Sequence, residues 1–251
     1  MAIAPIHVGI GGWDYEPWRG TFYPPGLPKS KQLEHASRRV TAIEINATFY
    51  KLQNEDLYRR WAEAVPEGFK FALKGSRFCV NRKILGTAEE AVGRFCGQGV
   101  HALGDRLAPI LWQMTETKRF DADDLRAFLA LLPSEAGGLR LRHALEVRHE
   151  SFEDPKLIEV AGEAGVAIAF VDADGVPRID AATADFAYAR LKRMREDEPE
   201  GYSPAELDRW AALARGWAES GREVFLFMIN GAKVRAPAAA EALLARLGRD
   251  E

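Results

Sequence analysis

Polar and charged side chains stand at the ends of several strand-like runs of this chain, each of which is otherwise apolar. In one such run, Ile43 and Ile45 alternate with Glu44 and Asn46, as residues do on the two faces of a β-strand. Two carboxylates in one low-dielectric site can serve as general acid and general base, because their surroundings push their pKa values apart. Glu44 and the similarly placed Glu146 are the candidates for that role.

Other strand-like runs end on residues that could complete such a site. Lys74 could form a Schiff base or neutralise developing charge, or it could simply pair with Glu44. Arg148 and Arg190 carry planar guanidinium groups that suit a carboxylate or a phosphate. Asp172 could join the carboxylates as a ligand of Mg²⁺, which prefers oxygen ligands. The sequence itself requires no metal and no cofactor, and it does not suggest a histidine-rich metal site.

Amide and aromatic side chains supply candidate contacts to a substrate. Gln113 and Asn230 each follow an apolar run, and the stretch around Trp13 and Tyr15 is rich in aromatic residues, as is the segment that ends at Tyr50. Such rings could form a platform for a sugar or a base, or they could be a packed lid. The candidate substrate-binding residues are Trp13, Tyr15, Asn46, Tyr50, Gln113, Arg148, Arg190 and Asn230.

Eight strand-like runs must position these residues, and helical patterns connect most of them. Such alternation is typical of a parallel sheet covered by helices, and eight repeats of it predict an α/β TIM-type (β/α)8 barrel. We expect one domain over residues 1–251, with an irregular crossover at 173–185 between strands six and seven. The predicted strands are 6–10, 41–46, 69–74, 107–113, 144–148, 166–171, 186–191 and 224–229.

Helix starts are predicted from residues that can accept hydrogen bonds from free backbone N–H groups. Thr87 with Glu90, and Ser203 with Glu206, have the spacing of a capping box. Asp154 precedes Pro155, which suits the first position of a helix. The remaining predicted caps are Ser30, Asn54 and Asp121.

In a barrel of this kind, the carboxyl ends of the strands meet at one mouth, where active sites are assembled. The coincidence of polar residues at so many strand ends therefore favours a functional site. The alternative is that these residues have only a structural role and form ion pairs, such as Glu44 with Lys74 and Glu146 with Arg148. Buried pairs add little net stability once desolvation is counted, so a cluster of them points to function.

Composition limits the remaining choices. The chain has 251 residues, 47% of them hydrophobic, and a formal net charge of −3, so it has no global attraction to nucleic acid or anionic membranes. Cys79 and Cys96 have no metal-type spacing and suggest no disulfide framework. The first residues lack the features of a signal peptide or membrane span, so we expect a cytoplasmic protein. Only the basic run 190–195 could attract nucleic acid.

Several of these residues also resemble those of a known family. The chain is similar to the family called domain of unknown function 72, the YecE-like proteins, nearly throughout its length. The resemblance implies a TIM-type barrel but no reaction, because the family's activity is not established. It rests on the stretches 11–15, 22–24, 44–50, 69–74 and 146–149, and on Trp18, Gly20, Trp61, Pro66, Gln113, Asp172, Tyr188, Arg190, Tyr202, Trp210 and Asn230.

The chain departs from the family pattern in three places. Leu191-Lys192 stands where a His-Gly pair is usual, and Met114 begins the segment where a proline-rich turn is usual. The last strand ends at Asn230 without the usual paired Asn residues. A role for the missing histidine therefore cannot be transferred to this chain.

These observations favour an enzyme that acts on a small anionic or sugar-like molecule in the barrel mouth. A hydrolase, an isomerase and a lyase all fit the inventory of side chains. One alternative is a non-catalytic protein that binds nucleic acid or a nucleotide through the aromatic loop and the basic run 190–195. Another is an interaction scaffold with a degenerate site.

Overall fold

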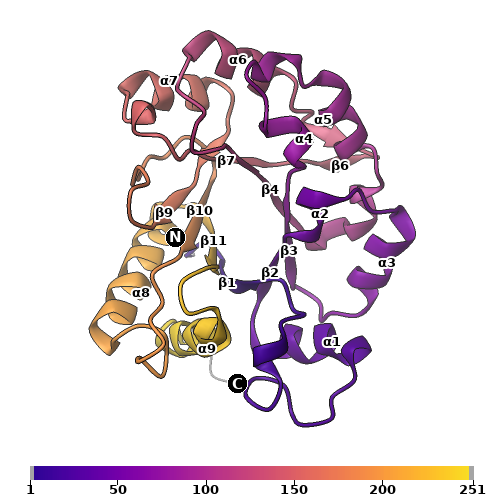
Figure 1. Cartoon of the computed structure of the whole chain (residues 1–251), viewed down its shortest axis with the longest axis vertical. Coiled ribbons are helices and arrows are strands. Elements are labelled where there is room, and N and C mark those ends of the chain that lie inside the picture. The colour runs from indigo at the N-terminus through magenta and orange to yellow at the C-terminus, as the bar shows by residue number, and fades with distance from the viewer. Residues whose placement is uncertain (1–2, 249–251) are drawn as a thin grey trace.

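Parallel strands form a ring in the middle of the molecule, and helices lie around it (Figure 1). This computed structural model describes residues 3–248. Neighbouring strands of the ring are parallel throughout. In order around the ring they are β1 (Ile6–Gly11), β2 (Ala42–Ile45), β3 (Lys70–Lys74), β4 (Leu107–Gln113), β7 (His143–Glu146), β8 (Ala167–Ile168), β9 (Phe170–Asp172), β10 (Phe186–Leu191) and β11 (Glu223–Met228).

The ring closes through a strand that is shared by two neighbours. β8 pairs with β7, β9 pairs with β10, and only Ala169 separates the two segments. Ala169 N still donates a hydrogen bond to Leu145 O at 2.9 Å, on the β7 side. β8 and β9 therefore occupy one position, which leaves eight positions in a (β/α)8 barrel, as predicted. The single strand expected at 166–171 is divided at Ala169.

Helices cover the outside of the ring, and the segment 173–185 between β9 and β10 contains no helix, as predicted. A short hairpin of β5 (Glu135–Ala136) and β6 (Leu139–Arg140), which was not predicted, precedes β7. The helices are α1 (Lys29–Arg39), α2 (Ala47–Tyr50), α3 (Glu55–Glu63), α4 (Arg77–Val80), α5 (Glu89–Cys96), α6 (Ala122–Ala130), α7 (Pro155–Glu163), α8 (Pro204–Glu219) and α9 (Ala236–Arg246), with 3-10 turns η1 (Glu16–Trp18), η2 (Leu85–Thr87), η3 (Val100–Arg106), η4 (Glu150–Phe152) and η5 (Lys233–Arg235).

Most of the predicted helix caps are confirmed. The side chains of Asn54, Asp121 and Asp154 each accept a hydrogen bond from a backbone N–H in the first turn of the following helix. Ser203 and Glu206 form the full reciprocal capping box at the start of α8. The helices α3, α6, α7 and α8 therefore begin where a side chain of the local sequence stabilises the first turn.

Two predicted caps are wrong. Ser30 lies inside α1, which begins at Lys29 after Pro28 and has no side-chain cap. The predicted box of Thr87 and Glu90 does not form, because the Thr87 hydroxyl donates to Ile84 O at 2.8 Å within η2. The Thr87 side chain is therefore bonded to the backbone of the preceding turn and does not cap α5.

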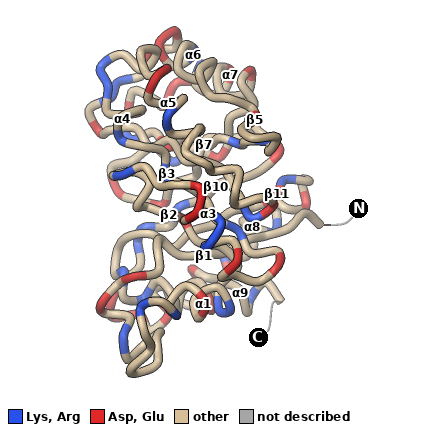
Figure 2. The backbone as a smooth tube through the Cα atoms, turned by 90° about the vertical axis from the view of Figure 1, so that its right-hand side faces the viewer, with Lys and Arg blue, Asp and Glu red and all other residues tan. Residues whose placement is uncertain are grey.

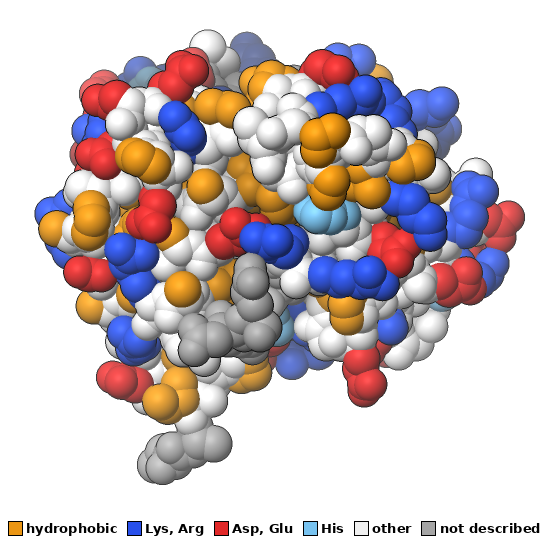
Figure 3. All heavy atoms as spheres, turned by 90° about the horizontal axis from the view of Figure 1, so that it is seen from below, with side chains coloured by type: hydrophobic (Ala, Val, Ile, Leu, Met, Phe, Trp, Pro, Cys, Tyr) orange, Lys and Arg blue, Asp and Glu red, His pale blue; other side chains and the backbone are white. Residues whose placement is uncertain are grey.

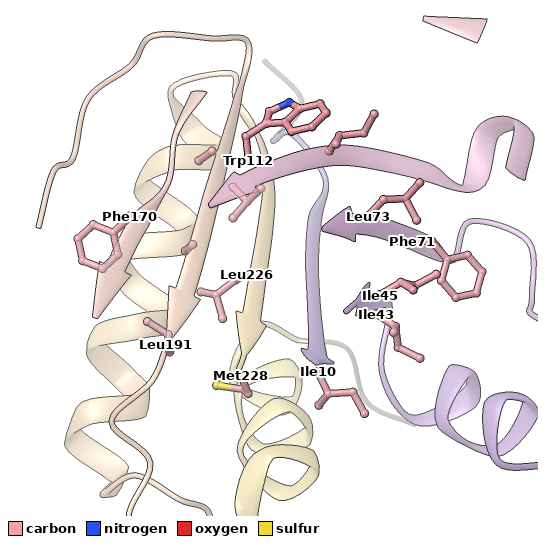
Figure 4. Packing of buried hydrophobic residues seen from close by; sticks show 14 of the residues in the cluster. Ile10, Ile43, Ile45, Phe71, Leu73, Trp112, Phe170, Leu191, Leu226 and Met228 are labelled. Carbon is pink, nitrogen blue, oxygen red and sulfur yellow. The ribbon is translucent and has the colours of Figure 1, made fainter. Parts of the chain in front are cut away.

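Alternation along the strands separates two hydrophobic layers. Ile43, Ile45, Phe71 and Leu73 lie on the side of β2 and β3 that faces away from the barrel centre (Figure 4). The inner layer joins alanines from five strands to larger side chains, of which the aromatic ones come from β10 and β11. The alanines of these strands are Ala42, Ala72, Ala108, Ala144 and Ala167, and the larger inner residues are Leu111, Val171, Phe186, Tyr188, Phe225, Phe227 and Ile229. The rings from β10 and β11 thus fill the space that the alanines leave, and polar groups gather beyond this layer.

Gly9 in β1 tests how tightly this ring is assembled. A Cβ atom at Gly9 would lie 2.0 Å from Ala42 O on the neighbouring β2, where no side chain fits. We expect Gly9→Ala to lower the free energy of unfolding by about 3 kcal/mol or more, measured by urea denaturation. Gly93→Ala in α5 is the matched control, because nothing lies within 4 Å of its Cβ position. It should stabilise the protein by about 0.5–1 kcal/mol. Equal stability of Gly9→Ala and the parent would contradict this packing.

Candidate functional site

The guanidinium of Arg190, on β10, joins two carboxylates that come from distant strands of the ring. Its Nε and Nη2 donate to Glu44 Oε2 and Oε1, each at 2.9 Å, and its Nη1 donates to Glu146 Oε2. Both carboxylates are completely buried, and Arg190 is 2% exposed. Three predicted site residues therefore meet in one hydrogen-bonded cluster, although Arg190 uses its guanidinium on the protein and not on a ligand.

Glu44 receives a third donor from the same strand as Arg190. The Tyr188 hydroxyl donates to Glu44 Oε2 at 2.8 Å, and burial together with the negative charge of Glu44 raises the pKa of Tyr188 well above its usual value. Tyr188 and Arg190 point the same way because they are two residues apart in a strand. The expected pairing of Glu44 with Lys74 does not form, and Arg190 and Tyr188 are the partners of Glu44 instead.

Glu146 lies among several donors at the end of β7. Its Oε1 accepts from Lys192 Nζ at 2.7 Å, from Gln113 Nε2 at 2.8 Å and from Arg148 Nε at 3.1 Å. Burial opposes ionisation, but the positive charges of Arg190, Lys192 and Arg148 outweigh it and hold the pKa of Glu146 well below its usual range. A carboxylate that stays ionised has little basicity at neutral pH, so Glu146 suits the positioning of cations better than acid and base work.

Lys74 differs from the other charged groups at the mouth. It is 9% exposed, and among the described residues its Nζ has no ion pair and no hydrogen bond, lying 4.3 Å from the centre of the Phe49 ring. Burial and the charge of Arg190, partly offset by Glu44 and Glu146, lower the pKa of Lys74 to about 8. Both forms of the amine are therefore accessible near neutral pH.

Asp172 and Asn230 do not belong to the cluster, because each directly follows a residue that faces the inside of the barrel and therefore points away from it. Val171 belongs to the inner layer, so Asp172 faces outward, where Arg178 Nη2 lies 2.5 Å from Oδ1. Burial raises the pKa of Asp172, despite the charges of Arg178 and Arg193. Asn230 is exposed and follows the inward-facing Ile229. The alternation of these strands already carried this information.

The predicted aromatic residues lie around the outside of the mouth. Trp13 packs against Trp61, with 5.4 Å between ring centres, and against the outward-facing Phe71. Tyr15 packs against Trp18 at 5.5 Å. Of the two interpretations of these aromatic residues, the contacts favour a packed lid and not a platform for a ligand. Tyr50, in contrast, is 63% exposed.

Asn46 stands at the start of α2, and its Nδ2 lies 3.5 Å from Glu44 O. Two members of the cluster, Tyr188 and Lys192, were missing from the predicted site. The spacing of Tyr188, Arg190 and Lys192 by two residues places all three on one face, which was the signal that could have identified them.

The basic run 190–195 is largely neutralised within the protein. Arg190 and Lys192 serve the buried cluster, and Arg193 Nη2 pairs with Asp174 at 2.6 Å. Arg195 pairs with Glu206 at 2.7 Å and with Glu198 at 3.1 Å. Lys and Arg side chains are likewise interspersed with Asp and Glu on the face shown in Figure 3. These pairs leave the run with little charge for binding phosphates.

Within residues 3–248, no three His, Cys, Asp or Glu side chains come together in a way that could hold a metal ion. The position between the two buried carboxylates, where a cation would be attracted, is taken by Arg190. In the same part of the chain, no helix combines the length and the hydropathy that are needed to cross a bilayer.

Removal of Arg190 should leave the buried carboxylate of Glu44 without a cationic partner and take one of three cationic partners from Glu146. We expect Arg190→Met to lower the free energy of unfolding by about 3–5 kcal/mol, measured by urea denaturation at pH 7. Arg193→Met removes an ion pair of a side chain that is 46% exposed, so it should cost about 1 kcal/mol or less. Similar losses in the two variants would contradict the central place of Arg190.

The pH dependence of stability should reveal the ionisation of Glu146. Its pKa is lower in the folded than in the unfolded protein, so its contribution is present above the unfolded value and is lost as the pH falls towards the folded one. In urea denaturation, the parent should lose stability below about pH 4.5 more steeply than Glu146→Gln does. Parallel pH profiles of the two proteins would show that Glu146 is not held ionised by the fold.

Comparison with known proteins agrees with this architecture. The chain is 26% identical to the UPF0759 protein YecE of Escherichia coli (strain K12) over 150 residues, which is 59% of this chain and 50% of YecE. The chain thus spans about half the length of this curated relative. A DUF72 family protein from Thermotoga maritima MSB8 has a similar structure, with a TM-score of 0.77 and 22% identity over 95% of this chain and 96% of that one.

The barrel is also shared with a sugar-converting enzyme. D-psicose 3-epimerase, solved in the presence of D-fructose, superimposes with a TM-score of 0.52 and 10% identity, covering 96% of both chains. At this identity the likeness concerns the fold alone. Residues 7–251 match the family described as Protein of unknown function DUF72, so the chain belongs to that family.

Proposed function

We propose that this protein is an enzyme that binds a small anionic, sugar-like molecule at the barrel mouth and transfers protons through Lys74. The observation that carries the proposal is the state of Lys74, a buried amine without a carboxylate partner among the described residues. An unpaired buried ammonium group is costly. Such a group suits a ligand that supplies the missing negative charge, and perturbed lysines of this kind are typical of functional sites.

The charge balance of the mouth favours an anionic ligand. The cations Lys74, Arg148, Arg190 and Lys192 stand against two buried carboxylates, Glu44 and Glu146. Burial lowers the pKa of Lys192 to about 8, as it does for Lys74, so both amines are mainly protonated at pH 7. The buried cations of the mouth therefore outnumber its buried carboxylates. Arg148 also pairs with the exposed Glu116, a contact that an anion could replace.

The carboxylates take a supporting part in this proposal. Glu44 and Glu146 were the expected acid and base, but their oxygens are engaged with Arg190 and neighbouring donors. Lys74 instead has a pKa near the pH of the cell, where proton transfer is most effective. Its place at the carboxyl end of β3 is where barrel enzymes assemble their catalytic groups.

A panel of sugar phosphates and sugar acids tests this function, with ligands identified by a rise in Tm and substrates by their consumption. Lys74→Arg keeps the positive charge but cannot release a proton near neutral pH. We expect it to keep binding the substrate while kcat falls by about 100-fold or more. The parent's rate should depend on a group with a pKa near 8, and this dependence should disappear in the variant.

Lys233→Met is the matched control for the same panel. Burial also lowers the pKa of Lys233, and its Nζ lies 4.7 Å from the centre of the Tyr15 ring, but it makes no contact with the cluster around Arg190. Its kcat should equal that of the parent. If Lys74→Arg keeps full activity, or if no compound of the panel is consumed, the proposed function is wrong.

A further inference from the structure

A cavity of about 420 Å³ lies beside the barrel mouth, on the side of α2, α4 and α5. In Figure 1 these three helices lie on the same side of the ring. The volume is in the range of sites for small ligands, which runs from about 300 to 1,000 Å³. None of its lining residues belongs to the cluster around Arg190, so this cavity needs an explanation of its own.

Exposed apolar side chains are concentrated at this cavity. Tyr50 is 63% exposed, Phe78 is 61% exposed and Leu52 is 41% exposed, and all three line it. Most large hydrophobic residues of the described chain are instead buried. Three of the six large hydrophobic side chains that are exposed in the described chain therefore line one cavity.

The two aromatic side chains are held out by short, well-anchored helices. In α2, the Thr48 hydroxyl donates to Lys74 O at 2.7 Å, which fixes this turn to the end of β3. In α4, Ser76 caps the first turn and Cys79 is completely buried. The rings of Tyr50 and Phe78 are therefore presented from rigid supports, as binding platforms require.

Positive charge surrounds the same cavity. No carboxylate of the described residues pairs with Lys51 or Arg82, and Arg82 is held by hydrogen bonds to the backbone oxygens of Phe78 and Thr87 at 2.7 and 3.1 Å. Arg94 and Glu90 also line the cavity, and they pair with each other at 2.6 Å. Figure 2 shows Lys and Arg positions beside α4 and α5. The cavity thus offers aromatic rings and uncompensated positive charge together.

We propose that this cavity binds a planar aromatic ring that carries a phosphate or carboxylate group. The ring stacks on Tyr50 and Phe78, and the anionic group is bound by Arg82 and Lys51. An aromatic ring fits better than an aliphatic ring, because only the planar aromatic ring can stack on an aromatic side chain and on a guanidinium group. This site stands independently of proton transfer by Lys74.

Contacts between aromatic residues link this site to the mouth. The rings of Tyr50 and Phe49 are 5.1 Å apart at their centres, and Lys74 Nζ lies 4.3 Å from the centre of Phe49. Phe49 thus contacts both Tyr50 and Lys74 and stands between the cavity and the cluster around Arg190.

Isothermal titration calorimetry of the full chain tests the proposal with three probes: phenyl phosphate, cyclohexyl phosphate and inorganic phosphate. We expect phenyl phosphate to bind about tenfold more tightly than the other two, because only it can stack. The double variant Tyr50→Leu, Phe78→Leu should lose this preference. Both side chains are largely exposed, so its Tm should match that of the parent.

Further variants separate the charge from the rings. Lys51→Gln and Arg82→Gln should each weaken phenyl phosphate severalfold and reduce the salt dependence of its binding. Ile158→Ala, which truncates another exposed side chain at α7, and Arg59→Gln on α3 are the matched controls and should bind as the parent does. Lys74→Met should also retain phenyl phosphate binding, which separates this proposal from the proposed catalytic role.

The source of the ligand is distinguished by two more probes. Preference for adenosine monophosphate over benzoate would point to nucleoside phosphates, and the reverse would point to aromatic carboxylates; either result supports the site. Equal binding of phenyl and cyclohexyl phosphate would overturn the proposal, as would a complete lack of binding. Loss of binding in Lys74→Met but not in the double variant would place the ligand in the mouth and overturn it as well.

Discussion

The bridge from Arg190 to two buried carboxylates holds the mouth of this barrel together. Glu44 comes from β2, Glu146 from β7 and Arg190 from β10, so the three charges tie together strands that are not neighbours in the ring. Each of these groups would be too costly to bury alone. The bridge thus fixes where the remaining cations can lie, and it leaves Lys74 as the amine that the protein does not neutralise.

The interior of the barrel explains why the cluster around Arg190 lies at the mouth and not midway along the strands. Inward-facing alanines on β2, β3, β4 and β7 leave space that aromatic rings from β10 and β11 occupy. That layer leaves no place for polar groups midway along the strands. The first inward position beyond it on β10 carries Arg190, whose long side chain reaches the carboxylates across the mouth. The packing of the inner layer and the position of the charged cluster therefore both follow from the alternation of inward-facing and outward-facing residues along the strands.

Much of the fold was predictable because its signals are local. β10 has the predicted bounds of 186–191, because the regular alternation of its six residues marks where the strand begins and ends. The capping box of Ser203 and Glu206 was also predictable, because it forms within one turn of helix. The partner of Glu44 was not predictable in this way. Lys74 is on the adjacent strand and looked like the natural partner, but only the closed ring brings Arg190 and Tyr188 across to Glu44. Roles that depend on closure need the assembled structure.

The division of one strand at Ala169 has a further consequence for motion. β8 and β9 are short, and each pairs with only one neighbouring strand, β8 with β7 and β9 with β10. Opening the barrel between β8 and β9 therefore breaks fewer backbone hydrogen bonds than separating β10 from β11, which pair along six residues. Local opening and amide hydrogen exchange follow such differences in backbone bonding. The barrel therefore has a seam, and the helix-free segment 173–185 begins directly after it. Local opening of the barrel wall would start at this seam.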